Sequence, residues 1–170
     1  SNLLFVKYEA GGHFSPHTDG YTIHDFNCRS LYSLLVYLND CPDGGGTSLL
    51  RSQEGYVRDE NGRFRWTDDS VMDRAPCRAG TCLIFFQDLP HEGEPVGEGC
   101  QKIIIRMDVM YERVPRVCDT EPDREAFRLF KEAELLEADG NVMDAAKMYR
   151  RIVRLSPDLS NRLGIYSGNY

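Results

Sequence analysis

The hydrophobic positions of this chain change character near residue 115. Before it, short runs rich in branched and aromatic residues alternate with glycine, proline, asparagine and aspartate, and no helical pattern intervenes. These runs are "LLFVKY", "LYSLLVYL", "GTSLL", "GTCLIFF" and "KIIIRMDVMY". Strands at such intervals predict a β-barrel or a β-sandwich. The polar segment 51–75 interrupts them with an Asn61-Gly62 hairpin-turn signal, so we interpret this segment as an excursion from the barrel rim.

After residue 115 the pattern becomes that of helices. The stretch "VPRVCDTEPD" has two prolines and no period, which predicts a linker. Next, "DREAFRLFKEAELLEA" predicts a helix with Asp123 as its N-cap. Its apolar face consists of Ala126, Leu129, Phe130 and Ala133. A second helix, "VMDAAKMYRRIVRL", ends before Ser156-Pro157. Its expected inward residues are Val142, Ala145, Ala146, Tyr149, Ile152 and Val153.

These patterns divide the chain into three expected segments. A mainly β domain covers 1–114, a linker covers 115–123, and a helical hairpin covers 124–170. The chain opens almost directly on a strand-like run, which suggests that the β domain is truncated at its N-terminus.

Composition and charge narrow the function classes. The chain has 170 residues, an ordinary globular composition and a net charge of −7, which argues against nucleic acid as a partner. No apolar run is long enough to span a membrane, and no signal peptide is visible. We therefore expect no membrane partner and a cytoplasmic or nuclear location. The six cysteines form no C-x-x-C pair and fit a reducing compartment, with one disulfide pair as the alternative.

The segment "GGHFSPHTDG" holds the first candidate chemistry. His17 and Asp19 are two residues apart, so on a strand their side chains point to the same face and could converge on one ion. His13 and His17 have a helical spacing, but Pro16 and the adjacent glycines disfavour a helix there. An isolated H-x-D is most often a hydrogen-bonded turn, so a metal site needs a third ligand.

His91, just after the apolar run "CLIFF", is the candidate third ligand. Two histidines and one carboxylate form the facial triad of non-haem Fe(II) oxygenases. Their common co-substrate is 2-oxoglutarate, whose far carboxylate needs a cation inside the barrel. On "QKIIIRMDVMY", Lys102 and Arg106 share one face with Ile104 and Asp108, and a basic residue in so apolar a strand must be paired. An ion pair with Asp108 or another buried acid, or an exposed barrel face, is an equal alternative.

Four stretches occur together in the order of a known family: "YEAGGHFSPHTD", "LLVYLND…GGGTSLL", "AGTCLIFF" and "HEGEPVGEGCQKIIIRMDVMYER". From about Val6 to Arg113 the chain resembles the prolyl 4-hydroxylase-like branch of the 2-oxoglutarate and Fe(II)-dependent oxygenases. The resemblance implies a double-stranded β-helix, or jelly roll, ahead of the α-helical hairpin. It also implies iron held by His17, Asp19 and His91.

The resemblance assigns further residues to the co-substrate. Lys102 matches the basic residue that binds the distal carboxylate of 2-oxoglutarate. Tyr37 matches a tyrosine that helps to bind this carboxylate, and Tyr8 matches a tyrosine that lines the pocket near the metal. For both tyrosines the alternative is a packed core aromatic. Lys102 lies one residue further from His91 than the family pattern has it. A bulge could absorb that residue; otherwise Arg106 is the anchor.

The implied activity is oxidative decarboxylation of 2-oxoglutarate with O₂, releasing succinate and CO₂ and hydroxylating a substrate. The first expected substrate is a prolyl or other side chain of a protein, and ascorbate is a further expected small molecule. One alternative is a non-catalytic binding module, which the intact ligand set argues against. Another is a same-fold oxygenase acting on a small molecule or an alkylated base, and the acidic charge disfavours the base.

The hairpin 126–159 resembles a single tetratricopeptide-type repeat. Small or apolar residues fill the expected positions, which are Leu129, Ala133, Leu136, Gly140, Ala145, Tyr149 and Ile152, followed by Pro157. One repeat cannot bury its own face, so it must pack on the barrel, on residues 160–170 or on a second copy. The simplest expectation is a docked hairpin that closes the barrel. The alternative is a surface for a protein partner or substrate peptide.

Overall fold

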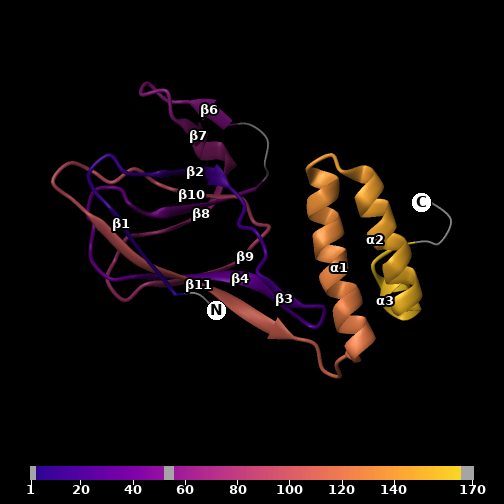
Figure 1. Ribbon diagram of the computed structural model, residues 1–170. Coiled ribbons are helices and arrows are strands. Elements are labelled where there is room, and N and C mark those ends of the chain that lie inside the picture. The colour runs from indigo at the N-terminus through magenta and orange to yellow at the C-terminus, as the bar shows by residue number, and fades with distance from the viewer. Residues whose placement is uncertain (1–2, 52–55, 166–170) are drawn as a thin grey trace. The chain divides into compact units, whose positions relative to one another are not determined.

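The computed structural model of the chain describes residues 3–51 and 56–165 (Figure 1). It divides into two compact units. The first consists of the residues up to Thr22 together with Ser30–Tyr111, and the second of Ile23–Arg29 together with the residues from Glu112 onward. The short segment Ile23–Arg29 lies inside the range that the sequence assigned to the β domain, yet it is grouped with the helices.

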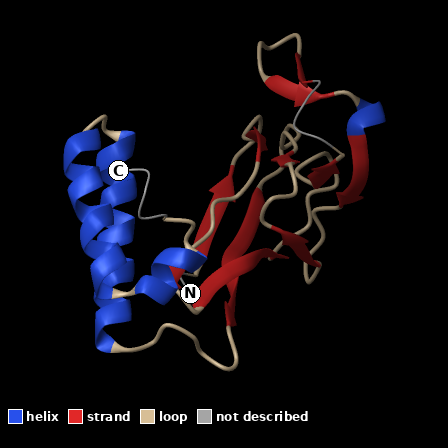
Figure 2. Ribbon diagram, turned by 90° about the vertical axis from the view of Figure 1, so that its right-hand side faces the viewer, coloured by secondary structure: helices blue, strands red, loops and turns tan. Residues whose placement is uncertain are grey.

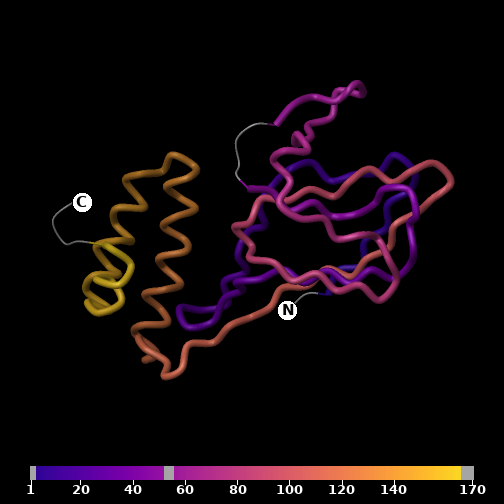
Figure 3. The backbone as a smooth tube through the Cα atoms, turned by 180° about the vertical axis from the view of Figure 1, so that it is seen from behind, coloured from indigo at the N-terminus to yellow at the C-terminus, as the bar shows by residue number. Residues whose placement is uncertain are grey.

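The first unit contains two main sheets. One has the order β1-β11-β4, with β9 also paired to β4, and the other has the order β2-β10-β5-β8. The strands are β1 (Leu4–Tyr8), β2 (Phe14–His17), β4 (Cys28–Tyr37), β5 (Thr47–Leu50), β8 (Val71–Ala75), β9 (Cys82–Phe86), β10 (His91–Gly93) and β11 (Lys102–Glu112). Figure 3 shows the two sheets face to face. All five apolar runs predicted as strands form strands, and the mainly β architecture is consistent with a jelly roll.

The core of this unit lies between the two sheets because strand alternation turns one face of each strand inward. On β4, Leu35 and Tyr37 are buried, and on β11 Ile104 is buried. They pack with Leu49 of β5 and Phe85 of β9 in one cluster. Each such apolar side chain contributes about 1.5–3 kcal/mol by leaving water, so truncation of Ile104 would destabilise both sheets together.

The turn before β2 depends on glycine. Gly11 has a φ of +77°, a conformation that side chains with a Cβ rarely adopt. The Gly12 N–H donates to the Glu9 carbonyl at 2.8 Å, which closes the turn. The chain then enters β2 as an extended strand, as the proline and glycines of this segment predicted.

The segment 51–75 is only partly the predicted excursion. β6 (Tyr56–Arg58) and β7 (Phe64–Trp66) form a separate antiparallel hairpin. Asp59 closes its turn by accepting from the Arg63 N–H at 2.9 Å, and Gly62 has a φ of +76°. Residues 71–75, however, form β8 of the second sheet. The interpretation of the whole segment as an excursion was therefore wrong for its last five residues.

The second unit is helical apart from β3 (Ile23–Asp25), which pairs with the first residues of β4. Its helices are α1 (Glu121–Ala138), α2 (Val142–Leu155) and α3 (Pro157–Arg162). Figure 2 shows them in blue, together with the 3-10 helix Asp68–Ser70 of the first unit. Phe26, in the tip between β3 and β4, packs edge to face against Phe127 with ring centroids 5.7 Å apart.

The first helix starts earlier than the sequence predicted. Thr120 is its N-cap, and Asp123 is the third helical residue rather than the cap. The Asp123 carboxylate accepts from the Thr120 N–H at 3.0 Å, which completes a capping box. The prediction failed because an acidic residue can satisfy helix N–H groups from either position. The segment 115–123, expected as a linker, therefore includes the first helical turn.

The helix faces follow the predicted periodicity. The buried residues are Ala126, Phe127, Leu129 and Ala133 on α1 and Ala145, Tyr149 and Ile152 on α2; Phe127 was not among the predicted inward residues. Val142 is 58% exposed, so its predicted inward position was wrong because it begins the helix. Leu159 and Ile165 are also buried in this core, so the hairpin packs partly on its own C-terminal segment. No described helix is long and apolar enough to cross a membrane.

Candidate metal centre

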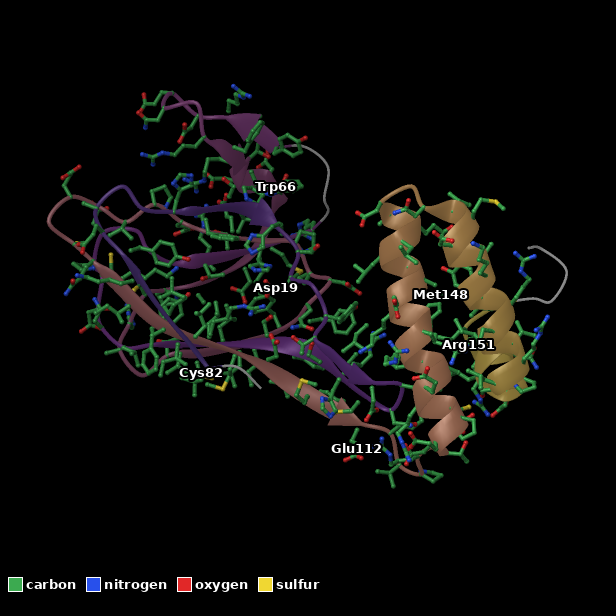
Figure 4. All side chains as sticks on the ribbon, viewed as in Figure 1. Asp19, Trp66, Cys82, Glu112, Met148 and Arg151 are labelled. Atoms are coloured by element: carbon green, nitrogen blue, oxygen red, sulfur yellow. The ribbon has the colours of Figure 1, made fainter. Side chains whose placement is uncertain are left out.

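His17, Asp19 and His91 come together between the two sheets. His17 ends β2 and pairs in register with His91, the first residue of β10, while Asp19 lies two residues beyond β2. The Nε2 atoms of His17 and His91 lie 3.7 and 3.8 Å from the two carboxylate oxygens of Asp19. One ligand atom from each of the three residues lies within 4.8 Å of the others. Asp19 is labelled in Figure 4.

Backbone carbonyls fix the orientation of both imidazole rings. The Nδ1 of His17 lies 2.7 Å from the Ser15 carbonyl, and the Nδ1 of His91 lies 2.9 Å from the Leu89 carbonyl. A carbonyl oxygen only accepts, so each Nδ1 carries a proton and each Nε2 offers its lone pair to the centre. Burial lowers the pKa of His91, which favours the neutral ring that binds metals.

The Asp19 carboxylate is held in its ionised form. Burial opposes ionisation, but the Ser33 hydroxyl that donates to Oδ2 and the positive charge of the Arg106 guanidinium outweigh it. The pKa of Asp19 therefore lies well below its usual range. An Arg106 Nη atom is 3.3 Å from Asp19 Oδ1 and 3.4 Å from Asp108 Oδ1, so this guanidinium bridges two carboxylates.

Residues outside the triad that hydrogen-bond to Asp19 and to its neighbours were not predicted from the sequence. Gln87 is fully buried. Its carbonyl accepts from the Asp19 N–H at 3.0 Å, its Nε2 donates to Asp108 at 3.0 Å, and its Oε1 accepts from Ser30 at 2.7 Å. A glutamine directly after the apolar run "CLIFF" was the available signal. Ser33, two residues before Leu35 on the inward face of β4, was detectable by alternation.

A cavity of about 340 Å³ extends from the triad to Lys102. The Lys102 side chain is buried, and its Nζ lies 3.3 Å from the Gly46 carbonyl. In the described part of the chain it forms no ion pair with an acidic side chain. The nearby Glu94 is instead paired with Arg74 at 3.0 Å. Burial lowers the pKa of Lys102 because a charged ammonium is costly away from water.

The two candidate anchors differ in their partners. Arg106 already faces two carboxylates, whereas Lys102 faces none in the described residues. The β1–β11 ladder runs in continuous register from Lys102 to Arg106, so no bulge occurs there. Residues 94–101 between β10 and β11 form a loop outside the two strands, which can accommodate an extra residue. The bulge that the sequence suggested is thus not needed in this ladder.

Both predicted tyrosines lie around the Lys102 ammonium. The Nζ is 5.4 Å from the ring centre of Tyr8 and 5.5 Å from that of Tyr37. The Tyr37 hydroxyl donates to Thr47 Oγ1 at 2.6 Å, and burial raises the pKa of Tyr37 to about 12, so it stays a neutral donor. Burial also raises the pKa of Tyr8. Thr47, which lines the same cavity, was missed by the sequence reasoning. His13 is not part of the cluster.

A family model described as the 2OG-Fe(II) oxygenase superfamily matches residues 3–107. The chain belongs to this superfamily. Membership supports an oxygenase that takes Fe(II), 2-oxoglutarate and O₂, and the matched range contains all three triad residues and Lys102. No curated protein matches the chain.

Two solved structures are similar to part of the chain. A prolyl-4-hydroxylase from Pseudomonas putida has 22% sequence identity and a TM-score of 0.42, and the match covers 65% of this chain and 51% of that one. The non-heme monooxygenase ThoJ, in a nickel complex, has 16% identity and a TM-score of 0.40, with 65% and 42% coverage. The chain thus spans about half the length of these structures or less.

Proposed function

We propose that this protein is a 2-oxoglutarate- and Fe(II)-dependent dioxygenase that hydroxylates a protein side chain, with prolyl as the first candidate. The observation that carries the proposal is a single cavity with the three candidate ligands at one end and a buried ammonium at the other. Such a cavity suits a metal and a dicarboxylate together.

The residues fit this pair of ligands. Two neutral imidazole nitrogens and one ionised carboxylate are the donor set of non-haem Fe(II) oxygenases. The Lys102 ammonium is costly to bury alone, and a carboxylate would pair it through a charge-assisted hydrogen bond. Tyr8 and Tyr37 flank that position and can orient the same carboxylate.

The iron, when bound with 2-oxoglutarate and O₂, would supply the oxidising chemistry. The chain would hold His17, Asp19 and His91 in place, neutralise the distal carboxylate at Lys102, and exclude water with the apolar walls Val6, Leu35 and Ile104. We also infer that the two facing sheets are the double-stranded β-helix expected of this family.

Succinate release tests the proposal. Purified protein with Fe(II), 2-oxoglutarate and O₂ should release succinate above background, and His17→Ala should release none. His13→Ala is the matched control, because this histidine lies four residues away and outside the cluster. Equal release by wild type and His17→Ala would contradict the proposal. A product 16 Da heavier on a peptide, rather than on a small molecule, would separate the proposed substrate class from its alternative.

A further inference from the structure

Three of the six cysteines lie together in the first unit, beside Lys102. Cys41 and Cys77 are buried in its core cluster, and the partly exposed Cys100 packs against the same cluster. The Cys41 N–H donates to the Cys77 carbonyl at 2.9 Å. The Cys41 thiol interacts with the thiol of Cys100, and the Cys77 thiol interacts with that of Cys41. All six cysteines are free in this structure, so these thiols meet without a covalent bond.

The backbone holds the loops that carry Cys41 and Cys100 side by side. The Gly45 N–H donates to the Pro95 carbonyl at 2.8 Å. At Gly44 the φ is +71°, and a Cβ there would collide with the same carbonyl oxygen. Only glycine allows such a close approach in this conformation. The loop after β4 and the loop before β11 therefore stay together while the thiols are reduced.

The three thiols differ in their access to a reagent in solution. Cys41 is 5% exposed and Cys77 is 3% exposed, whereas Cys100 lies partly exposed in the loop before β11. Burial raises the pKa of the Cys41 and Cys77 thiols, so both stay protonated at neutral pH. The thiolate is the form that reacts with oxidants, and reaction also requires access. Oxidation should therefore begin at Cys100, with Cys41 as the second thiol.

We propose that Cys100 and Cys41 are an oxidation site at which hydrogen peroxide forms a reversible disulfide. The Cys100 thiol gives up its proton, and the thiolate attacks one peroxide oxygen. The O–O bond breaks, hydroxide leaves and takes up that proton as water, and Cys100 becomes a sulfenic acid. The Cys41 sulfur then attacks the sulfenic sulfur to form the S–S bond, and its thiol proton leaves with the displaced hydroxide as a second water. The two thiols lose two electrons, and the peroxide gains them.

The disulfide forms beside the proposed anchor of 2-oxoglutarate. Lys102 follows Cys100 by two residues, and its Nζ lies 3.3 Å from the Gly46 carbonyl, which ends the loop that carries Cys41. Bond formation draws the two sulfur atoms closer than unbonded thiols can lie, so one loop shifts against the other. This consequence rests on the proposed function. Because the shift moves Lys102 relative to Gly46, the oxidised protein binds 2-oxoglutarate more weakly.

Peptide mapping tests the disulfide itself. The metal-free full chain is treated with an equimolar amount of hydrogen peroxide, free thiols are blocked with iodoacetamide, and tryptic peptides are analysed by mass spectrometry without reduction. We expect peptides 30–51 and 79–102 to be joined, and to separate after dithiothreitol treatment. Both Cys82 and Cys100 lie in the second peptide, so fragmentation must place the bond at Cys100. Absence of a joined peptide would overturn the proposal.

Two serine variants give the matched comparison. Cys100→Ser should abolish the joined peptide, whereas Cys82→Ser should leave it unchanged, because Cys82 is exposed on β9 (Figure 4). Thermal unfolding of each variant confirms that it is folded. A bond from Cys41 to Cys77 in the wild type, or a joined peptide that persists in Cys100→Ser, would assign the oxidation site to other residues and contradict the proposal.

Steady-state assays test the effect on the co-substrate. After peroxide is removed, Fe(II), 2-oxoglutarate and O₂ are added to the oxidised and the reduced protein. The KM for 2-oxoglutarate should be at least about fivefold higher in the oxidised wild type, the lower end of the usual coupling between sites, and dithiothreitol should restore it. Cys100→Ser should not respond. An unchanged KM beside a mapped disulfide would refute the coupling. Absence of succinate release in both forms, with the disulfide mapped, would refute the proposed function and leave the oxidation site intact.

Discussion

The two ends of the main cavity are built in opposite ways. At the triad every candidate ligand already has protein partners, since each histidine faces a backbone carbonyl and Asp19 faces Ser33 and Arg106. At the other end, Lys102 is buried with one carbonyl oxygen at 3.3 Å and no acidic partner in the described residues. Paired groups keep their geometry without a ligand, whereas a buried unpaired charge is costly. The triad is therefore preorganised, and the lysine end gains stability from an anionic ligand.

The largest expected effect comes from removing a triad ligand. Asp19→Ala deletes the carboxylate that lies between both imidazoles and leaves Arg106 with Asp108 alone. We expect Fe(II) affinity to fall by more than about 100-fold, beyond the usual effect of outer ligand partners. Anaerobic calorimetric titration with Fe(II) measures this, with His13→Ala as the control. Wild-type affinity in Asp19→Ala would mean that the triad is a hydrogen-bonded turn.

Lys102→Met tests the opposite end. The variant keeps an unbranched side chain but removes the buried ammonium, so the KM for 2-oxoglutarate should rise about 100-fold while Fe(II) affinity stays unchanged. The ligand-free protein should also unfold at a higher temperature, because an unpaired buried charge is lost.

Arg106→Ala is the matched comparison for that variant. If Arg106→Ala raises the KM for 2-oxoglutarate and Lys102→Met does not, the anchor has been assigned to the wrong residue. A lower unfolding temperature in ligand-free Lys102→Met would contradict the contrast between the two ends.

A smaller loss of Fe(II) affinity is expected when Ser33, which hydrogen-bonds to Asp19, is replaced. Ser33→Ala removes the hydroxyl that donates to Asp19 but leaves all three ligands in place. Fe(II) affinity should fall about tenfold, as for other partners of ligating carboxylates, with the KM for 2-oxoglutarate nearly unchanged. A larger change in the KM than in Fe(II) affinity would show that Ser33 acts elsewhere.

The smallest effect should come from Tyr37→Phe at the lysine end. The variant loses the hydrogen bond that Tyr37 donates to Thr47, which lines the cavity, so Thr47 is no longer held in place and the KM for 2-oxoglutarate should rise about fivefold. Because burial raises the pKa of Tyr37 to about 12, its hydroxyl stays protonated at and well above neutral pH. The ratio of the variant's KM for 2-oxoglutarate to the wild-type KM should therefore be the same from about pH 6 to about pH 9 in steady-state assays. A ratio that collapses over this range would indicate an ionised phenol.

Local patterns predicted the strands and the closeness of His17 and Asp19, because both depend on short spacings, whereas His91 was added from its place after an apolar run and from the family resemblance. Leu35 and Tyr37, two residues apart on β4, are both buried, and the H-x-D motif and His91 lie in one cluster. The support around Gln87 escaped prediction because its hydrogen bonds connect residues far apart in sequence, such as Ser30, 57 positions away. No single-strand pattern carries that information.

The boundaries were harder for similar reasons. Residues 23–29 belong with the helices because Phe26 packs on Phe127, a contact between distant segments that no local period encodes. The start of α1 depended on whether Asp123 caps the helix or completes a capping box, and the sequence allows both. The likeness of the hairpin to a tetratricopeptide repeat, and a partner for it, stay predictions.

The most direct measurement compares 2-oxoglutarate with 2-oxobutanoate, the analogue that lacks the distal carboxylate, by anaerobic calorimetry with Fe(II) present. Wild type should prefer 2-oxoglutarate by about 100-fold, because the distal carboxylate pairs the buried ammonium. In Lys102→Met the two ligands should bind with nearly equal affinity. If Lys102→Met keeps the wild-type preference, the buried ammonium does not receive the carboxylate and the contrast between the two ends is wrong.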